Sequence, residues 1–370
     1  MRFTCEADTL NEALQIVTKA LPSRTPNQIL EGVLIEVSDE DVVMTCSDER
    51  ITIVTRFEAN IAEPGRGVVP GKLFNEIVRR LMDGDIEIAM NDRFMFTIRG
   101  SGSRTNIAGQ DADLYPQLPA IDSEREIALP QDMLKDMIQK TEFAIAVEDM
   151  REVLTGSFLE IQGGDVTMVA LDGYRLALRR AQCSEVLEPC KAIIPGRAVG
   201  DIGKLLSDSE EAFATLTFGA GKLHIRLEKT DIYVILVSGE YIDYRKLLPA
   251  RFATRVIVDL ESFRKGIDRA ALIAREGNNN LLILKIAGGE MAIESHSQIG
   301  DVFEKLDVQQ DGGDLNIAFN VKYLTDVVRF IDAEQIEINL NSPIAPCIIT
   351  PVGDHDYVHL VLPVRTGATA

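Results

Sequence analysis

Short alternating strands and amphipathic helices succeed one another along the whole chain. Alternation of apolar and polar residues predicts strands at 2–7, 126–129 and 255–259. Each of these strands runs into a segment with helical spacing of apolar residues, and the helix starts carry good capping residues, at Asp8, Asp132 and Ser262. The same strand-into-helix pattern therefore occurs three times.

A second strand-into-helix segment repeats with a constant period. Residues 68–81 (VVPGKLFNEIVRRL) return at 193–206 (IIPGRAVGDIGKLL) and, more weakly, at 318–331 (AFNVKYLTDVVRFI). The offset is 125 residues both times, from Pro70 to Pro195 and from Pro195 to Asn320. Self-similarity at a fixed period indicates one structural unit written three times.

Proline-containing segments at 113–119 (DLYPQLP) and 243–249 (DYRKLLP) separate the units. We therefore expect domains at 1–120, 125–249 and 253–370. Each unit reads as strand, helix and three alternating strands, twice over; strands predicted at 41–46 and 50–57 have counterparts at 165–170 and 174–179. Two βαβββ halves per domain, with two helices over a largely antiparallel sheet, predict an α+β fold with six helices in the chain.

Net charge limits how the chain can contact nucleic acid. Lys and Arg total 38 against 58 Asp and Glu, which gives a formal net charge of −20. This charge favours solubility and opposes tight binding to DNA. Any contact with DNA must then come from a local basic face.

The second helix of every unit offers such a face. Each begins with a basic residue and carries another seven positions later: Lys72 and Arg79, Arg197 and Lys204, Lys322 and Arg329. Positions seven apart lie about 20° from each other around a helix and share a face. An acidic residue follows the first basic residue of each helix by four positions, at Glu76, Asp201 and Asp326. For any single helix, the alternative to a contact with DNA is therefore a solvent-exposed face with ion pairs. Three copies in an acidic chain favour a shared role in weak, sequence-independent phosphate contacts.

Motifs for catalysis, metal binding or membrane insertion do not stand out. The five cysteines, at positions 5, 46, 183, 190 and 347, lack C-x-x-C or zinc-ligand spacing and read as small, buried hydrophobic residues of a reducing compartment. His355 and His359 are four residues apart, but they lie in a predicted loop and strand and not on a helix, so we do not expect them to bind a metal ion together. No P-loop and no G-x-S-x-G motif occurs in the sequence. Asp172 could be a catalytic carboxylate, but its counterpart Asp48 in the matching turn favours a structural role. With no apolar leader and no long apolar run, we expect a cytoplasmic protein without membrane contact, cofactor, metal or catalytic residues.

Several short motifs carry a family resemblance over residues 1–365. They are Phe3-Thr4, 171–177 (LDGYRLA), 243–249, 319–321 (FNV) and 362–365 (LPVR). In this order, over three repeats, they resemble the bacterial DNA polymerase III beta subunit, the beta sliding clamp. The resemblance implies a non-catalytic processivity factor of DNA replication, a head-to-tail homodimer that closes six domains into a ring. Helices would line the hole, and duplex DNA would be held by topology without sequence specificity.

The resemblance also implies DNA contacts and a partner pocket. Family DNA contacts fall on Arg24, Lys72, Arg79 and Arg197, to which the basic helix face adds Lys204 and a nearby loop adds Arg151. In that loop Glu148 and Val153 replace the family's Gln and Tyr. The pocket would receive short linear motifs from the polymerase alpha subunit, the clamp-loader delta subunit, repair and translesion polymerases, ligase and mismatch-repair proteins. An apolar trough with a few polar groups suits an extended peptide with Leu and Phe anchors.

By position, the pocket would comprise Leu154, Leu171, Gly173, Tyr174, Arg175, Leu176, Ile242, Lys246, Leu247, Asn320, Tyr323, Ile344, Leu360, Leu362, Pro363, Val364 and Arg365. Ordinary core packing is the alternative for these residues. Ile242 stands where a Pro is usual, Lys246 where an Arg is usual, and Val364 replaces a common Met.

Ring closure would use Arg104, Thr105 and Ile107 of the first domain with Leu272, Ile273, Asp301 and Glu304 of the third. Thr105 stands where a large apolar residue is common. The alternative to a clamp is a repeat-built enzyme or adhesive scaffold that uses a sheet surface.

Overall fold

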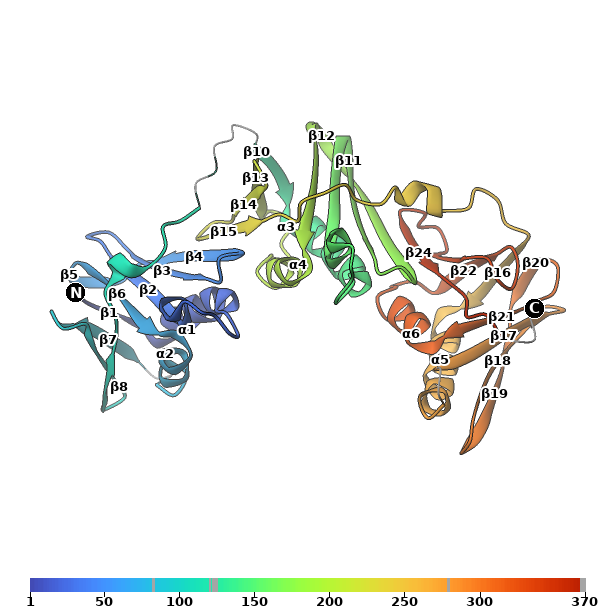
Figure 1. Ribbon diagram of the computed structural model, residues 1–370, viewed down its shortest axis with the longest axis horizontal. Helices are drawn as coiled ribbons and strands as arrows, with labels where there is room; N and C mark the ends of the chain where they lie inside the picture. The colour runs from blue at the N-terminus through green and yellow to red at the C-terminus, as the bar shows by residue number, and fades with distance from the viewer. Residues whose placement is uncertain (82–83, 120, 122–125, 278–279, 367–370) are drawn as a thin grey trace. The chain divides into compact units, whose positions relative to one another are not determined.

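The computed structural model describes residues 1–81, 84–119, 121, 126–277 and 280–366 (Figure 1). Within these ranges the chain forms six α-helices and 24 strands, which pair antiparallel in four sheets. The predicted α+β class and the predicted helix number agree with this architecture.

The elements follow the repeat. The first repeat contains β1 (Arg2–Glu6), α1 (Ala7–Val17), β2 (Gly32–Val37), β3 (Val42–Ser47), β4 (Ile51–Phe57), β5 (Asn60–Glu63), β6 (Gly65–Pro70), α2 (Gly71–Val78), β7 (Asp85–Met90), β8 (Met95–Gly100) and β9 (Ser103–Ala108). The second contains β10 (Glu126–Pro130), α3 (Gln131–Thr141), β11 (Gly156–Leu171), β12 (Arg175–Pro195), α4 (Gly196–Gly203), β13 (Phe213–Gly219), β14 (Lys222–Arg226) and β15 (Thr230–Ile235).

The third repeat contains β16 (Thr254–Asp259), α5 (Leu260–Arg275), β17 (Leu281–Ala287), β18 (Glu290–Ser297), β19 (Gly300–Asp307), β20 (Gln309–Gly312), β21 (Leu315–Asn320), α6 (Val321–Arg329), β22 (Gln335–Leu340), β23 (Cys347–Pro351) and β24 (Tyr357–Val361). Short 3₁₀ turns lie at η1 (Thr18–Ala20), η2 (Gln28–Glu31), η3 (Ala112–Leu114), η4 (Glu142–Ala144), η5 (Glu152–Thr155) and η6 (Tyr244–Leu247).

The middle repeat departs from the predicted strand pattern. The segments predicted as separate strands at 165–170 and 174–179 are the ends of the long strands β11 and β12. These two strands pair from Gly156 with Pro195 to Leu171 with Leu176, with register shifts between Ile161 and Asp165. Because of these register shifts, β11 and β12 stay paired along their whole length although the hydrophobic alternation breaks there.

Two compact units contain the four sheets. The first unit is Met1–Asp132 with Lys204–Leu236, and it holds the sheets β5-β1-β7-β8-β9 and β10-β13-β14-β15-β4-β3-β2-β6. The second unit is Met133–Gly203 with Val237–Ala370, and it holds the sheets β11-β12-β24-β23-β22-β16-β20 and β19-β18-β17-β21. Strand β15 pairs with β4 and β12 pairs with β24, so backbone hydrogen bonds cross the boundaries between repeats.

Helix pairs cover the sheets through their apolar faces. In the first unit α1 packs beside α2, where Leu14 and Phe74 are fully buried. In the second unit α5 packs beside α6 and against β18, where Phe263 and Leu324 are fully buried. Burial of the apolar stripe leaves the opposite, charged face of each helix in solvent.

Candidate functional site

A cavity of about 320 Å³ opens in the second compact unit, beside the turn that joins β11 to β12. Nine of the predicted pocket residues line it: Leu171, Gly173, Tyr174, Arg175, Leu176, Ile242, Leu247, Leu360 and Leu362. Its floor consists of core residues, since Leu171, Leu176 and Leu360 are at most 5% exposed. The two interpretations of these residues, core and pocket, are therefore compatible.

Two further residues line the cavity that sequence reasoning did not assign to it. Pro346 comes from the segment before β23, and no periodic signal marked it. Arg151, predicted as a DNA contact, also lies in the lining and pairs with the Asp149 carboxylate at 3.2 Å. This pair raises the pKa of Arg151 and lowers the pKa of Asp149 through side-chain hydrogen bonding. Arg151 therefore brings a guanidinium group, paired with Asp149, to the cavity wall.

The β11–β12 turn places two lining residues by local hydrogen bonding. Oδ1 of Asp172 accepts hydrogen bonds from the backbone N–H groups of Tyr174 at 2.9 Å and Arg175 at 3.0 Å. Gly173 between them has φ = +87°, a conformation that side chains disfavour. Asp48 accepts equivalent bonds at 2.9 and 2.8 Å in the first repeat, which supports the structural role predicted for Asp172.

The C-terminal segment is fastened along the cavity by two backbone hydrogen bonds. The N–H of Leu362 donates to the carbonyl of Tyr174 at 2.8 Å, and the N–H of Val364 donates to the carbonyl of Ala318 at 2.7 Å. Leu362 and Pro363 are half-buried and Arg365 is exposed. This segment therefore forms part of the wall and joins strands that are far apart in the sequence.

The other predicted pocket residues lie outside the cavity lining. Leu154 is fully buried in the core beneath it, and Ile344 is 53% exposed. Lys246 is exposed and pairs with Asp243 at 3.1 Å. Asn320 caps α6, since its side chain accepts from the N–H of Lys322, and Tyr323 stacks on Tyr174 with ring centroids 5.8 Å apart.

The basic positions of the second helices are in solvent, as their spacing predicts. Lys72, Arg79, Arg197, Lys204, Lys322 and Arg329 are all exposed. Each of these helices has an acidic residue four positions after its first basic residue. In the described part of the helices, Asp201 is the only one of the three that pairs with that basic residue, Arg197, at 3.7 Å. Glu76 pairs with Arg80 instead, and Asp326 pairs with Arg175. Arg24 is exposed in the loop after α1.

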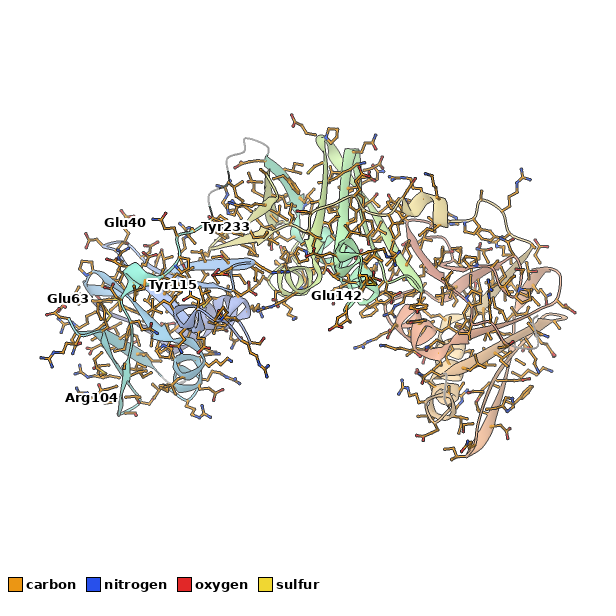
Figure 2. All side chains as sticks on the ribbon, in the orientation of Figure 1. Glu40, Glu63, Arg104, Tyr115, Glu142 and Tyr233 are labelled. Atoms are coloured by element: carbon orange, nitrogen blue, oxygen red, sulfur yellow. The ribbon has the colours of Figure 1, made fainter. Side chains whose placement is uncertain are left out.

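Five of the residues predicted for ring closure lie on terminal strands of two sheets, and the other two, Leu272 and Ile273, lie on α5. In the sheet orders of the described chain, β9 ends the five-stranded sheet and β19 ends the four-stranded sheet. Arg104 on β9 is exposed at the margin of the first unit (Figure 2), Thr105 is half-buried, and Ile107 is only 6% exposed. On the other strand Asp301 is exposed, whereas Glu304 already holds Arg269 through two bonds of 2.6 and 2.7 Å.

An exposed apolar patch accompanies β19. Leu272 on α5 is 66% exposed and Phe303 on β19 is 60% exposed, while Ile273 is half-buried. Sequence reasoning missed Phe303, although the strict alternation of exposed and half-buried residues along β19 places it on the outer face. Large apolar side chains in solvent on a terminal strand are typical of a protein contact.

The cysteines differ in their burial within the described residues. Cys5, Cys46 and Cys347 are buried, as predicted, whereas Cys183 and Cys190 are half-buried. Burial raises the pKa of the Cys5 thiol to about 12, which suppresses the reactive thiolate. Across the same ranges, no cluster of His, Cys, Asp and Glu could hold a metal ion, and no helix could cross a membrane.

Comparison with known proteins gives a consistent match along the chain. The family model for the N-terminal domain of the DNA polymerase III beta subunit matches residues 1–119, that for the central domain matches 128–243, and that for the C-terminal domain matches 245–365. A beta sliding clamp of Staphylococcus aureus is 34% identical over 378 aligned residues, covering 99% of this chain and 100% of the relative.

Solved structures extend the likeness to the fold. A DNA polymerase sliding clamp from Bacillus subtilis superposes with a TM-score of 0.94 at 33% identity and covers 99% of both chains. A DNA polymerase III beta subunit from Eubacterium rectale gives a TM-score of 0.94 at 30% identity, with 99% of this chain and 100% of that chain covered. The chain therefore belongs to the DNA polymerase III beta subunit family, the beta sliding clamps that serve bacterial replication as non-catalytic processivity factors.

Proposed function

We propose that two copies of this chain join head to tail into a closed ring that encircles duplex DNA. The ring would contain six domains, three from each copy at 1–120, 125–249 and 253–370. The observation that carries this proposal is the pair of terminal strands, β9 in one compact unit and β19 in the other. Because each has a row of backbone groups open on one side, β9 of one copy can pair with β19 of the other.

Charge and apolar surface support this pairing. Arg104 on β9 and Asp301 on β19 carry opposite charges, and both are exposed with no ion pair inside the described part of the chain. Phe303, two residues along β19 from Asp301, and Leu272 on α5 provide exposed apolar side chains for this contact. A head-to-tail contact between two different surfaces closes into a ring when the rotation between copies completes a circle.

Binding to DNA would depend on enclosure, because the chain as a whole is strongly acidic. The net charge of −20 disfavours DNA on the outer surface, whereas the exposed bases of the second helices attract phosphates locally. We include Arg24, Lys72, Arg79, Arg197 and Lys204 in this contact. We leave Arg151 out of it, since it lines the cavity. Few phosphate contacts and no base contacts leave a ring free to slide.

The cavity beside the β11–β12 turn would take a short peptide of a partner protein. Its apolar floor suits Leu or Phe side chains, and the guanidinium group of Arg151 suits backbone carbonyl or carboxylate oxygens. The family supports the replicative polymerase as a partner, and we extend this to the clamp loader, repair and translesion polymerases, ligase and mismatch-repair proteins. The chain would act in the cytoplasm.

The ring proposal is tested by mass and by retention on circular DNA. Light scattering after size-exclusion chromatography should give twice the chain mass of 40.8 kDa at micromolar concentration. After loading, the protein should stay on nicked circular DNA and leave when the circle is cut to a linear form. A monomer that also leaves intact circles would overturn the proposal and favour a repeat-built scaffold.

A further inference from the structure

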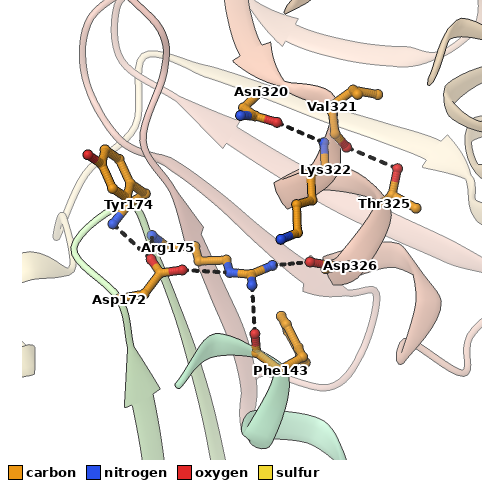
Figure 3. Close-up of polar contacts among 9 residues, drawn as sticks. All are labelled: Phe143, Asp172, Tyr174, Arg175, Asn320, Val321, Lys322, Thr325 and Asp326. Atoms are coloured by element: carbon orange, nitrogen blue, oxygen red, sulfur yellow. Dashed lines mark hydrogen bonds and ion pairs between the residues drawn. The ribbon is translucent and has the colours of Figure 1, made fainter. Parts of the chain in front are cut away.

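Arg175 makes contacts in two directions from the cavity wall. Its guanidinium is only 7% exposed and binds the Asp172 carboxylate at 3.0 Å through Nε. Nη2 donates to the carbonyl of Phe143 at 2.7 Å, and Nη1 contacts the carboxylate of Asp326 on α6 (Figure 3). The rings of Tyr323 and Phe143 lie 5.0 and 5.4 Å from the guanidinium carbon. A buried charge held by so many groups has little freedom to change partners.

Asp326 has candidate partners on its own helix and takes one outside it, Arg175. Asp326 lies four residues after Lys322 on α6, the spacing at which Lys and Asp commonly pair. Among the described residues, no ion pair joins the Lys322 ammonium to Asp326 (Figure 3). In the middle repeat the equivalent i,i+4 pair, between Arg197 and Asp201, does form at 3.7 Å.

We propose that Arg175 is a positioning residue for DNA contact: it holds Asp326 away from Lys322, so that the third repeat presents an unneutralised lysine to the DNA phosphates. The inference rests on the proposed function. It adds Lys322 to the DNA contacts and gives Arg175 a role beyond the cavity wall. One ion pair then belongs both to the partner cavity and to the DNA-facing helix.

The structure gives a physical reason for the choice Asp326 makes. Its carboxylate is 26% exposed and its partner Arg175 is nearly buried, so this pair is shielded from water and salt. A Lys322–Asp326 pair would lie on the solvated face, where water and salt weaken such pairs. Without Arg175, Asp326 would lose the shielded partner, and the bases within reach on its own helix would be Lys322, four residues before it, and Arg329, three residues after it.

The experiment measures binding of a short fluorescent linear duplex by anisotropy over a range of salt concentrations. A linear duplex can enter a closed ring from its end, so neither the clamp loader nor the partner cavity is needed. Lys322→Gln should lower the magnitude of the negative slope of log affinity against log salt by about 0.9 for each phosphate that the lysine no longer neutralises. Arg175→Gln should lower it equally, and the double variant should show no further decrease, because both changes remove the same phosphate interaction.

A matched pair of acidic residues separates this effect from net charge. Asp326→Asn and Asp172→Asn remove the same charge from the same guanidinium, but only Asp326 lies one turn from Lys322. In the Arg175→Gln background, Asp326→Asn should restore the salt slope, whereas Asp172→Asn should not. If both substitutions restored the salt slope equally, or if neither restored it, the proposal would be overturned.

A second comparison does not depend on whether Arg175→Gln folds. With Arg175 intact, Asp326→Asn and Asp172→Asn should change duplex affinity equally, since Asp326 is already withheld from Lys322. A larger gain from Asp326→Asn would contradict the proposal. A Lys72→Glu, Arg197→Glu variant serves as the reference. If this variant also binds the duplex normally, the proposed DNA contact itself is wrong. If it binds weakly while the Arg175 tests fail, only the role proposed for Arg175 is wrong.

Discussion

At the scale of single residues, His359 is unusual because it is buried without a polar partner. Neither ring nitrogen has a hydrogen-bond partner in the described chain, and the ring packs against Tyr357 and Phe143 at centroid distances of 4.3 and 5.8 Å. Burial lowers the pKa of His359 to about 3. The folded chain therefore keeps this imidazole neutral where an unfolded histidine would be protonated.

His359 should make stability depend on pH between its two pKa values. The unfolded histidine, with a pKa of about 6.5, binds a proton as the pH falls, whereas the folded one stays neutral until about pH 3. Stability from this residue is thus present above pH 6.5 and lost below it. Between pH 7.5 and 5.5 the parent should lose about 1.4 kcal/mol more unfolding free energy than His359→Leu. Denaturant titrations at matched protein concentration measure this, and parallel pH curves would contradict it.

At the scale of elements, the terminal strands β9 and β19 allow a charge-exchange test. Arg104→Glu should weaken dimerisation by roughly tenfold, because an exposed pair contributes up to about 1 kcal/mol and occurs twice per ring. Asp301→Arg should weaken it similarly, and the double variant should recover affinity. Analytical ultracentrifugation measures the dissociation constants. Additive losses in the double variant would show that the two side chains do not meet.

The exposed bases of the second helices lead to a different element-scale prediction. Lys72→Glu with Arg197→Glu reverses charge on the solvent faces of α2 and α4 without touching a buried side chain. We expect a marked fall in duplex affinity and in loading on circular DNA, with the dimer mass unchanged. Glu76→Lys with Glu142→Lys provides an opposite-charge control on nearby helical turns. Normal loading of the first variant would exclude these faces from DNA contact.

At the scale of the whole molecule, the C-terminal segment joins the cavity to both neighbouring sheets. Removing residues 362–370 deletes the two backbone bonds to Tyr174 and Ala318 and opens one wall of the cavity. We expect binding of a labelled peptide with Leu and Phe anchors to be lost, while the dimer mass and duplex affinity persist. Isothermal titration with the peptide measures this. Retained peptide affinity would place the partner site elsewhere.

How far the sequence predicts the fold depends on the range of the interaction. The helices at 71–78, 196–203 and 321–329 were predictable, because their apolar spacing and 125-residue period can be read from the sequence. The fusion of the predicted strands at 165–170 and 174–179 into β11 and β12 was missed, because the ladder continues where the hydrophobic alternation stops.

The sequence alone therefore determined the repeat, the α+β class, the exposed basic positions and the membership of the clamp family. These follow from patterns that each segment carries within itself. Only the tertiary structure decided that Pro346 and Arg151 line the cavity, that Phe303 is exposed beside Asp301, and that Asp326 pairs with Arg175. The reason is physical: each depends on which distant strands and helices meet, and local periodicity does not encode those meetings.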